Sequence, residues 1–358
     1  MPNSQTSVVV IGGGQSGLAA ARAVRDAGLH PLVLEAGDRP VGSWPHYYDS
    51  LTLFSPARYS AMPGLPFPGD PDRYPTRDEV ADYLRSYADS LGVEIRTGHR
   101  VRTVSTTPTG FLVHTAAGEE IPASGIVAAS GTFGRPHLPV LPGQQEFSGE
   151  VRHVAQYREP APYAGRRVIV VGAGNSAVQV GYELADVATV TLASVSPVHF
   201  LDQRPNGRDL HHWLDTSGFD DLPPAWLAKV IHHIPVLDTG GYRKAFESGV
   251  IDRRPMFTTF EEDRVVWADG TSEHVDAVIF ATGYRPHLDY LEPIGALDAG
   301  LPQHVAGIST THPGLVYVGL EFQRSFSSNT LRGVSRDADY VVSALAAHVR
   351  DAVTIVGL

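Results

Sequence analysis

The sequence predicts an α/β fold built from two Rossmann-like domains, each a parallel sheet flanked by helices, with the second domain inserted into the first. Its 358 residues correspond to two domains at about 150 residues each. Two segments, starting at Val8 and Val168, resemble each other: each has a β-branched run, a glycine turn, and small apolar residues at helical spacing. They lie farther apart than solenoid repeats. The repeat therefore predicts two strand–turn–helix units.

The other elements are predicted in chain order from periodicity and turn residues. A helix is expected over 76–91, because Thr76 and Glu79 have the spacing of a capping box before an amphipathic run. Several prolines predict a linker over 134–149. Strands are expected at 8–11, 32–35, 93–96, 111–114, 125–129, 168–171, 275–281 and 315–319, and further helices around 226–233 and over 335–349.

Composition excludes several classes of protein. The chain has no cysteine, which excludes disulfides, thiolate zinc sites, Fe–S clusters and a cysteine nucleophile, so any redox chemistry needs a bound cofactor. The net charge of −11 argues against nucleic-acid partners. No apolar run reaches the length of a membrane span, and no basic segment precedes the first apolar run. We therefore expect a cytoplasmic protein with no membrane partner.

The first glycine turn has the pattern G-x-G-x-x-G at Gly12, Gly14 and Gly17, directly after a strand. Gly12 permits a tight turn, Gly14 allows a pyrophosphate to approach the backbone, and Gly17 lets the helix pack on the strand. The helix N-terminus favours anionic phosphates. Glu35, at the end of the next strand, can accept hydrogen bonds from ribose hydroxyls. This turn therefore predicts a dinucleotide site.

The second turn, at Gly172, Gly174 and Ala177, is the G-x-G-x-x-A variant. No carboxylate ends its following strand, where Ser194 and Ser196 stand instead. A carboxylate there would select NAD, so small hydroxyl residues with Arg204 within loop reach are compatible with NADP. The alternative is that the two serines only cap a loop, and the sequence leaves both open.

A third segment lies between the two turns and reads F-x-G-x-x-x-H-x-x-x-Y, from Phe147 through Gly149 and His153 to Tyr157. It resembles the identifying motif of class B flavin-containing monooxygenases; Baeyer–Villiger enzymes carry Trp at the last aromatic position. The resemblance covers nearly the whole chain. Gly42-Ser43-Trp44 resembles a flavin-side G-x-W element, Ser130-Gly131 and Ala281-Thr282-Gly283 resemble the domain crossings, and 74–84 and 50–56 are similar to YUCCA and arsenic-cluster flavoproteins, respectively.

The resemblance implies an FAD domain over 1–160 and 283–358, with an NADP domain over 161–282 inserted between its parts. The motif order agrees, because the crossing at 281–283 returns the chain. It implies FAD and NADPH as cofactors, held by Gly12, Gly14, Gln15, Ser16, Gly17, Glu35, Ser43, Trp44, Gly131, Gly172, Gly174, Asn175, Ser176, Ser194, Arg204, Thr282 and Gly283.

The implied reaction is a monooxygenation: NADPH reduces FAD, O₂ forms a C4a-(hydro)peroxyflavin, and one oxygen atom passes to a small substrate. The substrate would be a soft N, S or As nucleophile or a carbonyl compound. Many family members place an asparagine over the flavin where this chain has Leu53-Phe54-Ser55, so Ser55, Arg58 and Asn175 are the candidate donors. An NAD(P)H:flavin oxidoreductase or oxidase and a non-enzymatic flavin-binding redox partner stay open as alternatives, as does a homodimer.

Three pairs of adjacent basic residues have simpler interpretations. Adjacent histidines at His211-His212 and His232-His233 point about 100° apart on a helix, and the chain has no H-E-x-x-H pattern. We therefore expect no metal site. Arg253-Arg254 is either a phosphate clamp or a surface pair, and the sequence favours the surface pair.

Overall fold

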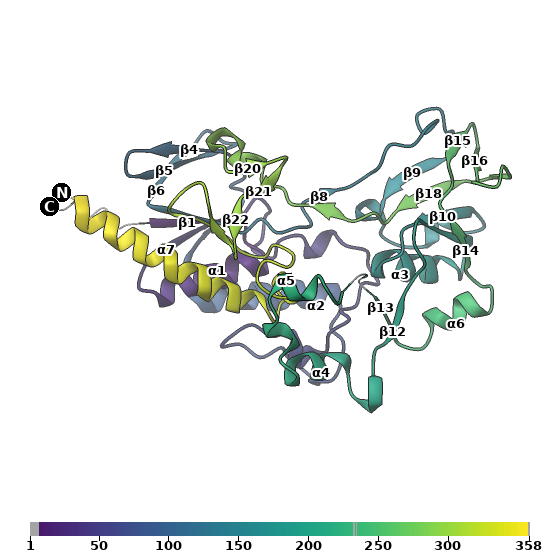
Figure 1. Ribbon diagram of the computed structural model, residues 1–358, viewed down its shortest axis with the longest axis horizontal. Coiled ribbons are helices and arrows are strands. Elements are labelled where there is room, and N and C mark those ends of the chain that lie inside the picture. The colour runs from purple at the N-terminus through teal and green to yellow at the C-terminus, as the bar shows by residue number, and fades with distance from the viewer. Residues whose placement is uncertain (1–6, 232, 234, 357–358) are drawn as a thin grey trace.

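The computed structural model describes residues 7–231, 233 and 235–356, and it has two parallel sheets side by side along the long axis of the molecule (Figure 1). The first sheet has the order β22-β23-β24-β7-β1-β2-β3. Its parallel strands are β1 (Ser7–Ile11), β2 (His30–Leu34), β3 (Glu94–Arg96), β7 (Gly125–Ala128) and β24 (Leu315–Tyr317), and its antiparallel edge is β22 (His304–Val305) and β23 (Ile308–Ser309).

Both faces of the first sheet are covered by apolar packing. Val8 and Val10 of β1 belong to a core shared with three helices, and Val9 and Ile11 face a three-stranded antiparallel sheet. Strands buried on both faces are continuous apolar runs, which explains why β1 shows no alternation. The helices are α1 (Gln15–Asp26), α2 (Arg77–Leu91) and α7 (Val334–Val356), and the small sheet is β4 (Val101–Thr107), β5 (Gly110–Thr115) and β6 (Glu120–Ala123).

The second sheet repeats this plan in the order β14-β11-β10-β18-β9, with all strands parallel. Helices cover one face and a three-stranded antiparallel sheet covers the other. The strands are β9 (Glu150–His153), β10 (Arg167–Val171), β11 (Thr189–Ser194), β14 (Asp252–Pro255) and β18 (Ala277–Phe280); the covering elements are α3 (Asn175–Leu184), α6 (Tyr242–Glu247), β15 (Thr259–Glu261), β16 (Arg264–Val266) and β17 (Ser272–His274).

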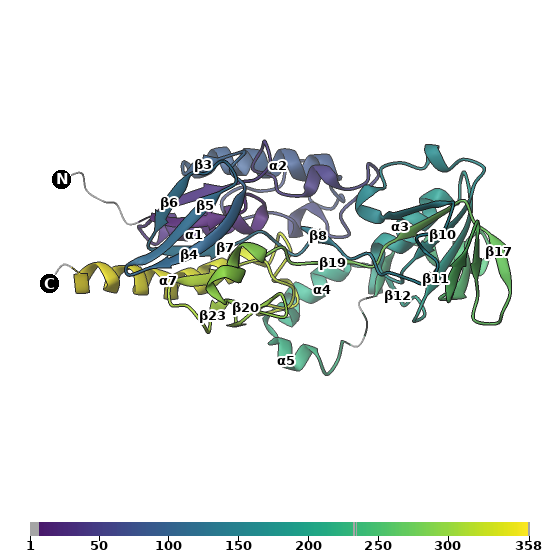
Figure 2. The same cartoon turned by 90° about the horizontal axis from the view of Figure 1, so that it is seen from above.

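The chain passes between the two sheets twice, and the two crossings lie side by side (Figure 2). In the crossings, β8 (Arg135–Pro136) pairs antiparallel with β19 (Tyr284–Arg285). β9 precedes residue 161, the predicted start of the inserted domain, yet it hydrogen-bonds to β18 in the second sheet. The second sheet therefore takes a strand from the family-motif segment, which directly follows the first crossing.

We call each of the two parallel sheets, together with the elements that cover it, a lobe. An arm of the chain, residues 203–231, leaves the second sheet and packs against the first lobe. Two short parallel strands, β12 (Phe200–Asp202) and β13 (Val236–Asp238), flank it. The arm carries the short helices α4 (Leu210–Thr216) and α5 (Pro224–Leu227), which lie beside the first lobe in Figure 1. Arg332, just before α7, binds Asp220 of the arm through Nε and Nη2, at 2.7 and 3.0 Å, with both side chains nearly buried.

Most predicted elements are confirmed within one to three residues, but the closing helix predicted over 335–349 extends seven residues further, as α7 (Val334–Val356). α2 begins at Arg77 after the predicted capping box, in which Glu79 N–H donates to the Thr76 hydroxyl and Thr76 N–H to the Glu79 carboxylate. The helix predicted around 226–233 is wrong in extent, because α5 ends at Leu227; His232 lies outside the described residues. Among the strands that the sequence did not predict are β4, β6 and β14 and the three strands β15, β16 and β17. None of the described helices is long and apolar enough to cross a membrane.

Candidate cofactor and active site

The first glycine turn joins β1 to α1 and needs glycine for steric reasons. Gly12 has φ +107°, and a Cβ there would lie 2.6 Å from the Ala129 carbonyl oxygen. A Cβ on Gly17 would lie 1.8 Å from the Gly12 carbonyl oxygen. The N-cap of α1 is Gly14, and no side chain caps the helix. Its first N–H groups therefore lack a side-chain partner, which fits the phosphates of a dinucleotide.

Glu35 follows β2 and is only 8% exposed. One carboxylate oxygen accepts the Gly13 N–H at 2.6 Å, and the other accepts the Gly37 N–H at 2.7 Å. The side chain thus reaches from the second strand to the glycine turn. A carboxylate has about four lone-pair positions, so both oxygens can also accept ribose hydroxyls. That contact with ribose stays a prediction.

The segment 319–329, which follows β24, also contacts the first glycine turn. Trp44 Nε1 donates to the Gln15 side-chain oxygen at 2.8 Å, and Gln15 Nε2 donates to the Asn329 carbonyl at 2.7 Å. A Cβ on Gly319 would lie 1.9 Å from the Ser16 hydroxyl. The predicted residues Gln15, Ser16 and Trp44 are therefore brought together, while Ser43 bonds instead to the Tyr47 hydroxyl at 2.9 Å. Sequence reasoning missed Gly319 and Asn329; the only sequence signal was the glycine at the end of a predicted strand.

The second turn reproduces the first. Gly172 has φ +145°, Gly174 caps α3 without a side chain, and Ala177 is fully buried. The Gly172 N–H donates to the Ala193 carbonyl at 2.9 Å, as the Gly12 N–H donates to the Leu34 carbonyl at 2.9 Å. Ser194 therefore occupies the position that Glu35 has in the first lobe.

The two residues predicted to distinguish NADP lie in different surroundings. The Ser194 hydroxyl donates to the Ser196 carbonyl at 2.7 Å and accepts from Arg253, on the neighbouring strand β14, at 3.2 Å. Arg204 stands at the start of the arm, where a hydrogen bond with Tyr74 raises the pKa of the guanidinium. The arginine at the end of β11 is thus Arg253, which the sequence favoured as a surface residue.

The family motif contacts the second crossing through His153. A Cβ on Gly149 would lie 2.5 Å from the Phe147 ring, so only glycine fits. His153 is 3% exposed; its Nδ1 accepts the Ala155 N–H at 3.1 Å, so Nε2 carries the proton and donates to the Gly283 carbonyl at 3.0 Å. Burial lowers the pKa of His153, which keeps the ring neutral. Tyr157 is buried and donates to Glu183 at 2.8 Å.

Glycine and hydroxyl residues shape both crossings. Gly131 and Gly283 have φ +73° and +79°, and a Cβ on either would meet no atom within 4 Å. The Thr282 hydroxyl donates to the His137 carbonyl, and the His137 N–H donates to the Gly283 carbonyl at 3.0 Å. Open space beside both glycines leaves the backbone accessible to a ligand between the lobes.

The three candidate hydrogen-bond donors for the oxygen chemistry differ in how far they are already engaged by other residues. The Ser55 hydroxyl bonds to the Ser60 hydroxyl at 2.9 Å, and Arg58 is a half-exposed partner of Asp72 at 2.9 Å. Asn175 is the first residue of α3; its side-chain oxygen accepts the Leu237 N–H at 3.3 Å. No hydrogen bond or ion pair connects Asn175 with Ser55 or Arg58 in the described part of the chain.

A hollow of about 330 Å³ lies between the lobes. Leu53, Phe54 and Tyr74 line it from the first lobe, and Gln179 and Leu237 line it from the second, with Gln203 from the arm. It borders the second glycine turn, since Leu237 is the partner of Asn175. Its size and mixed lining suit a small substrate.

Next to this hollow, the arm is held by a network of polar groups around Asp209. The carboxylate accepts from Tyr74 at 2.5 Å, from Gln203 at 2.8 Å and from the His211 ring at 2.8 Å. Burial raises the pKa of Asp209, but these hydrogen bonds outweigh it and hold the pKa at about 2. The His211 ring is stacked against Phe54 and Tyr59, at 6.0 and 6.2 Å between ring centroids.

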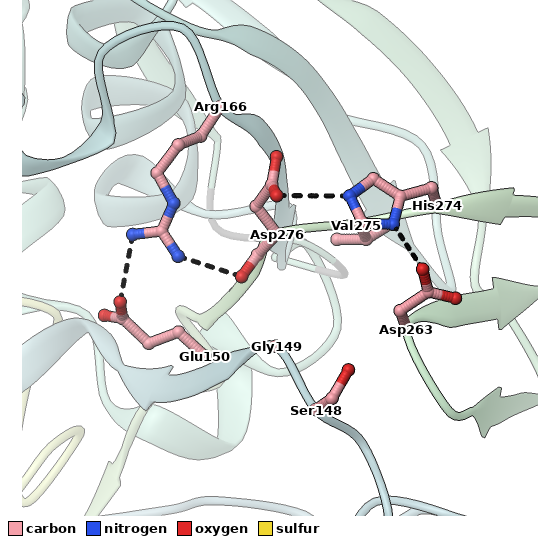
Figure 3. Close-up of a pocket in the computed structure, with 8 residues that line it drawn as sticks. All are labelled: Ser148, Gly149, Glu150, Arg166, Asp263, His274, Val275 and Asp276. Carbon is pink, nitrogen blue, oxygen red and sulfur yellow. Dashed lines mark hydrogen bonds and ion pairs between the residues drawn. The ribbon is translucent and has the colours of Figure 1, made fainter.

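A second hollow, of about 410 Å³, lies at the end of the second sheet that is opposite to the glycine turn; Figure 3 shows its lining residues. Glu150, Arg166 and Asp276 line it where β9, β10 and β18 begin, far from the carboxyl ends where Rossmann folds bind nucleotides. His274 lies between Asp263 and Asp276, whose hydrogen bonds raise its pKa. No group of three or more His, Asp or Glu side chains that could hold a metal occurs among the described residues.

Comparison with known proteins gives the family. Residues 9–213 match the family model described as pyridine nucleotide-disulphide oxidoreductase. The chain is 30% identical to the uncharacterized oxidoreductase CzcO-like of Geobacillus kaustophilus, over 95% of this chain and 98% of that protein. It is also 30% identical to indole-3-pyruvate monooxygenase YUCCA1 of Oryza sativa subsp. japonica, over 92% and 89% of the two chains.

A solved structure supports the same grouping. The flavin-containing monooxygenase from Stenotrophomonas maltophilia superimposes with a TM-score of 0.84 at 32% identity, covering 96% of this chain and 99% of that one. The predicted fold class is thereby confirmed. Together with the two glycine turns and the motif between them, these matches show that the chain belongs to the flavin-containing monooxygenase family and is a flavin monooxygenase-like oxidoreductase.

Proposed function

We propose that the protein is an FAD-dependent, NADPH-reduced monooxygenase that inserts one oxygen atom of O₂ into a small substrate bound between its lobes. One observation carries the proposal: two uncapped glycine turns stand at the carboxyl ends of two parallel sheets, and His153 of the family motif binds the second crossing between the sheets. Family membership implies a flavin and a nicotinamide nucleotide. The names of the rice and Stenotrophomonas relatives support a monooxygenase.

The first turn fits FAD and the second fits NADPH. Glu35 would accept the ribose hydroxyls of FAD, the N-terminus of α1 would face its pyrophosphate, and Trp44 would lie along it. The N-terminus of α3 would face the pyrophosphate of NADPH. When bound, the flavin takes a hydride from NADPH and activates O₂, so that NADPH, a proton, O₂ and substrate give NADP⁺, water and oxygenated substrate.

The chain's own residues position the reactants and exclude water. His153, neutral and buried, fixes the Gly283 carbonyl and with it the second crossing. Phe54 and Leu53 supply apolar surface to the hollow. The Asn175 side chain keeps its N–H₂ group without a partner in the described chain, because only its oxygen is engaged. Among the three candidates it is therefore the hydrogen-bond donor we favour.

An NAD(P)H oxidase that transfers no oxygen to substrate is the second candidate. The observation that favours it is the engagement of both donors near Phe54: Ser55 is bonded to Ser60, and Arg58 is paired with Asp72. Without a free donor there, activated oxygen would leave as H₂O₂. This candidate shares both cofactor sites with the monooxygenase.

The test measures NADPH consumed, product formed and H₂O₂ released with a panel of amines, sulfides, ketones, indole-like keto acids and arsenicals. A monooxygenase gives, for at least one class, product in near-equal amount to the NADPH consumed and little H₂O₂. If H₂O₂ matches NADPH for every compound, the oxidase is correct. If the holoprotein consumes no NADPH, both candidates fail and a non-enzymatic redox partner remains.

A further inference from the structure

We infer that Arg253 on β14 is the residue that recognises the 2′-phosphate of NADPH and thereby sets the coenzyme preference. The inference deepens the proposed function and rests on it only in requiring that the second glycine turn binds a nicotinamide nucleotide. It replaces Arg204 in the role that the sequence suggested.

The position of the coenzyme ribose follows from the first lobe. The residue after the second strand of a Rossmann fold meets the adenosine ribose, where a carboxylate accepts the 2′-hydroxyl and repels a 2′-phosphate. Glu35 has this place in the first lobe, and the matched hydrogen bonds of Gly12 and Gly172 assign the same place to Ser194 in the second. The second lobe therefore offers a neutral hydroxyl where the first has a charge.

Arg253 brings a positive charge to this place. Its Nε and Nη2 donate to the Ser194 hydroxyl at 3.3 and 3.2 Å, and Nη2 approaches the Ser194 carbonyl at 3.4 Å. β14 pairs with β11 so that Arg253 is opposite Leu192. Side chains two residues apart share a face of a strand, so Arg253, Leu192 and Ser194 lie on the face that packs on α3.

The charge of Arg253 is uncompensated, unlike that of its neighbours. Arg254 pairs with Asp269 at 3.3 Å and stacks on Trp267 at 4.0 Å, on the opposite face of the strand. Arg167 pairs with Glu273 at 3.0 Å. Within the described part of the chain, no carboxylate lies within ion-pair distance of Arg253, and its Nη1 has no hydrogen-bond partner.

An unpaired, partly buried arginine is unusual in a chain that carries 39 acidic and 28 basic residues. A phosphate would supply the missing negative charge, and the planar guanidinium donates to phosphate oxygens in two parallel bonds. Arg204 is less suited to this role, because it stands at the start of the arm and no hydrogen bond or ion pair joins it to Ser194 or to β14 in the described part of the chain. The geometry thus favours Arg253 over Arg204.

The test measures binding of 2′,5′-ADP and of 5′-ADP to the FAD-loaded protein by calorimetry, which requires no turnover. We expect the unchanged protein to bind 2′,5′-ADP more tightly. Arg253→Gln should lose roughly tenfold or more of the affinity for 2′,5′-ADP, the scale of a charged hydrogen bond, and keep its affinity for 5′-ADP. Arg254→Gln is the matched control and should keep the ratio.

A second variant protects the test against misfolding of the first. Ser194→Glu recreates the carboxylate of the first lobe, so it should lower the affinity for 2′,5′-ADP and spare that for 5′-ADP. Equal losses for both ligands with Arg253→Gln, or a selective loss with Arg204→Gln in its place, would overturn the inference. If neither ligand binds the unchanged protein, the proposed coenzyme site itself fails. A failure of oxygen transfer alone leaves the binding ratio intact.

Discussion

Single side chains shape the proposed flavin site at the first glycine turn. Glu35 accepts backbone N–H groups from Gly13 and Gly37, so its carboxylate both orders the turn and faces the proposed ribose. This double use explains why the residue is nearly buried although it is charged. The arrangement leaves little tolerance for a neutral side chain.

Glu35→Gln should lower the fraction of protein that retains FAD after gel filtration. The amide places two N–H groups where a carboxylate accepts hydrogen bonds, which costs about 1.5–3 kcal/mol. Asp38→Asn is the control, since the Asp38 side chain is 92% exposed. Equal flavin content in all three proteins would contradict the assignment of Glu35.

Gly17 of the first turn and Gly174 of the second turn should respond differently to substitution by alanine. Gly17→Ala should destabilise the protein by about 3 kcal/mol, because the new Cβ would overlap the Gly12 carbonyl. Gly174→Ala should leave the thermal midpoint and the FAD content unchanged, because no atom lies within 4 Å of its Cβ. It should weaken NADPH binding, since the methyl group projects toward the proposed pyrophosphate. Unimpaired NADPH binding would argue against a coenzyme at this turn.

At the scale of the elements, the arm packs against the first lobe, and the ion pair between Arg332 and Asp220 anchors it there. Arg332 and Asp220 are 10% and 6% exposed, whereas the neighbouring pair Arg336–Asp221 is 48% and 74% exposed. Removing one partner of a buried pair costs about 3–5 kcal/mol, while an exposed pair contributes about 0–1 kcal/mol. The two pairs therefore form a matched comparison.

Arg332→Ala should release the arm and speed tryptic cleavage at Lys229, which lies in it. Asp221→Ala removes only the exposed pair and should leave the cleavage rate close to that of the unchanged protein; Arg336 is not the control, since it also lies 3.8 Å from Asp220. The measurement is limited proteolysis followed by mass spectrometry, with the thermal midpoint as a check on global folding. Slow cleavage in both variants would show that the ion pair does not anchor the arm.

Acid should weaken the contact between the arm and the first lobe. The folded pKa of Asp209 is about 2, below the ordinary value of 3.8, so the unfolded chain binds this proton first as the pH falls. Asp209 therefore contributes about 2 kcal/mol of stability above pH 4, and that contribution is lost between about pH 4 and pH 2. In urea unfolding, the gap between the unchanged protein and Asp209→Asn should narrow over this range.

Asp215→Asn is the control for this pH dependence, because Asp215 is an exposed carboxylate of the same helix. Its unfolding free energy should follow that of the unchanged protein at each pH. A gap for Asp209→Asn that stays constant from pH 5 to pH 2.5 would show that the Asp209 proton is not linked to folding.

At the scale of the whole molecule, the sequence predicted those features that depend on the spacing of residues close together in the chain. Glycine turns and Glu35 could be found because a strand, a turn and a helix follow one another within a few tens of residues. The contacts of Arg253 with Ser194 and of Asn329 with Gln15 could not be found in this way. They join residues far apart in the chain, and only the order of strands in the sheet brings them together.

The arm illustrates the same limit. Residues 197–255 show no helical period, because their helices α4, α5 and α6 are only seven, four and six residues long. Proline-bounded short helices such as α5 leave a weak periodic signal. In the first lobe, Tyr74 binds Asp209 and Arg332 binds Asp220. The position of the arm therefore depends on contacts between residues far apart in the chain.

The most direct test of the account is the visible spectrum of the purified chain under anaerobic titration with NADPH. We expect about one FAD per chain, with the yellow colour bleached by one equivalent of NADPH as both nucleotide sites are filled. A chain that is colourless as purified, and stays colourless after incubation with FAD, would contradict the claim that its first glycine turn holds a flavin.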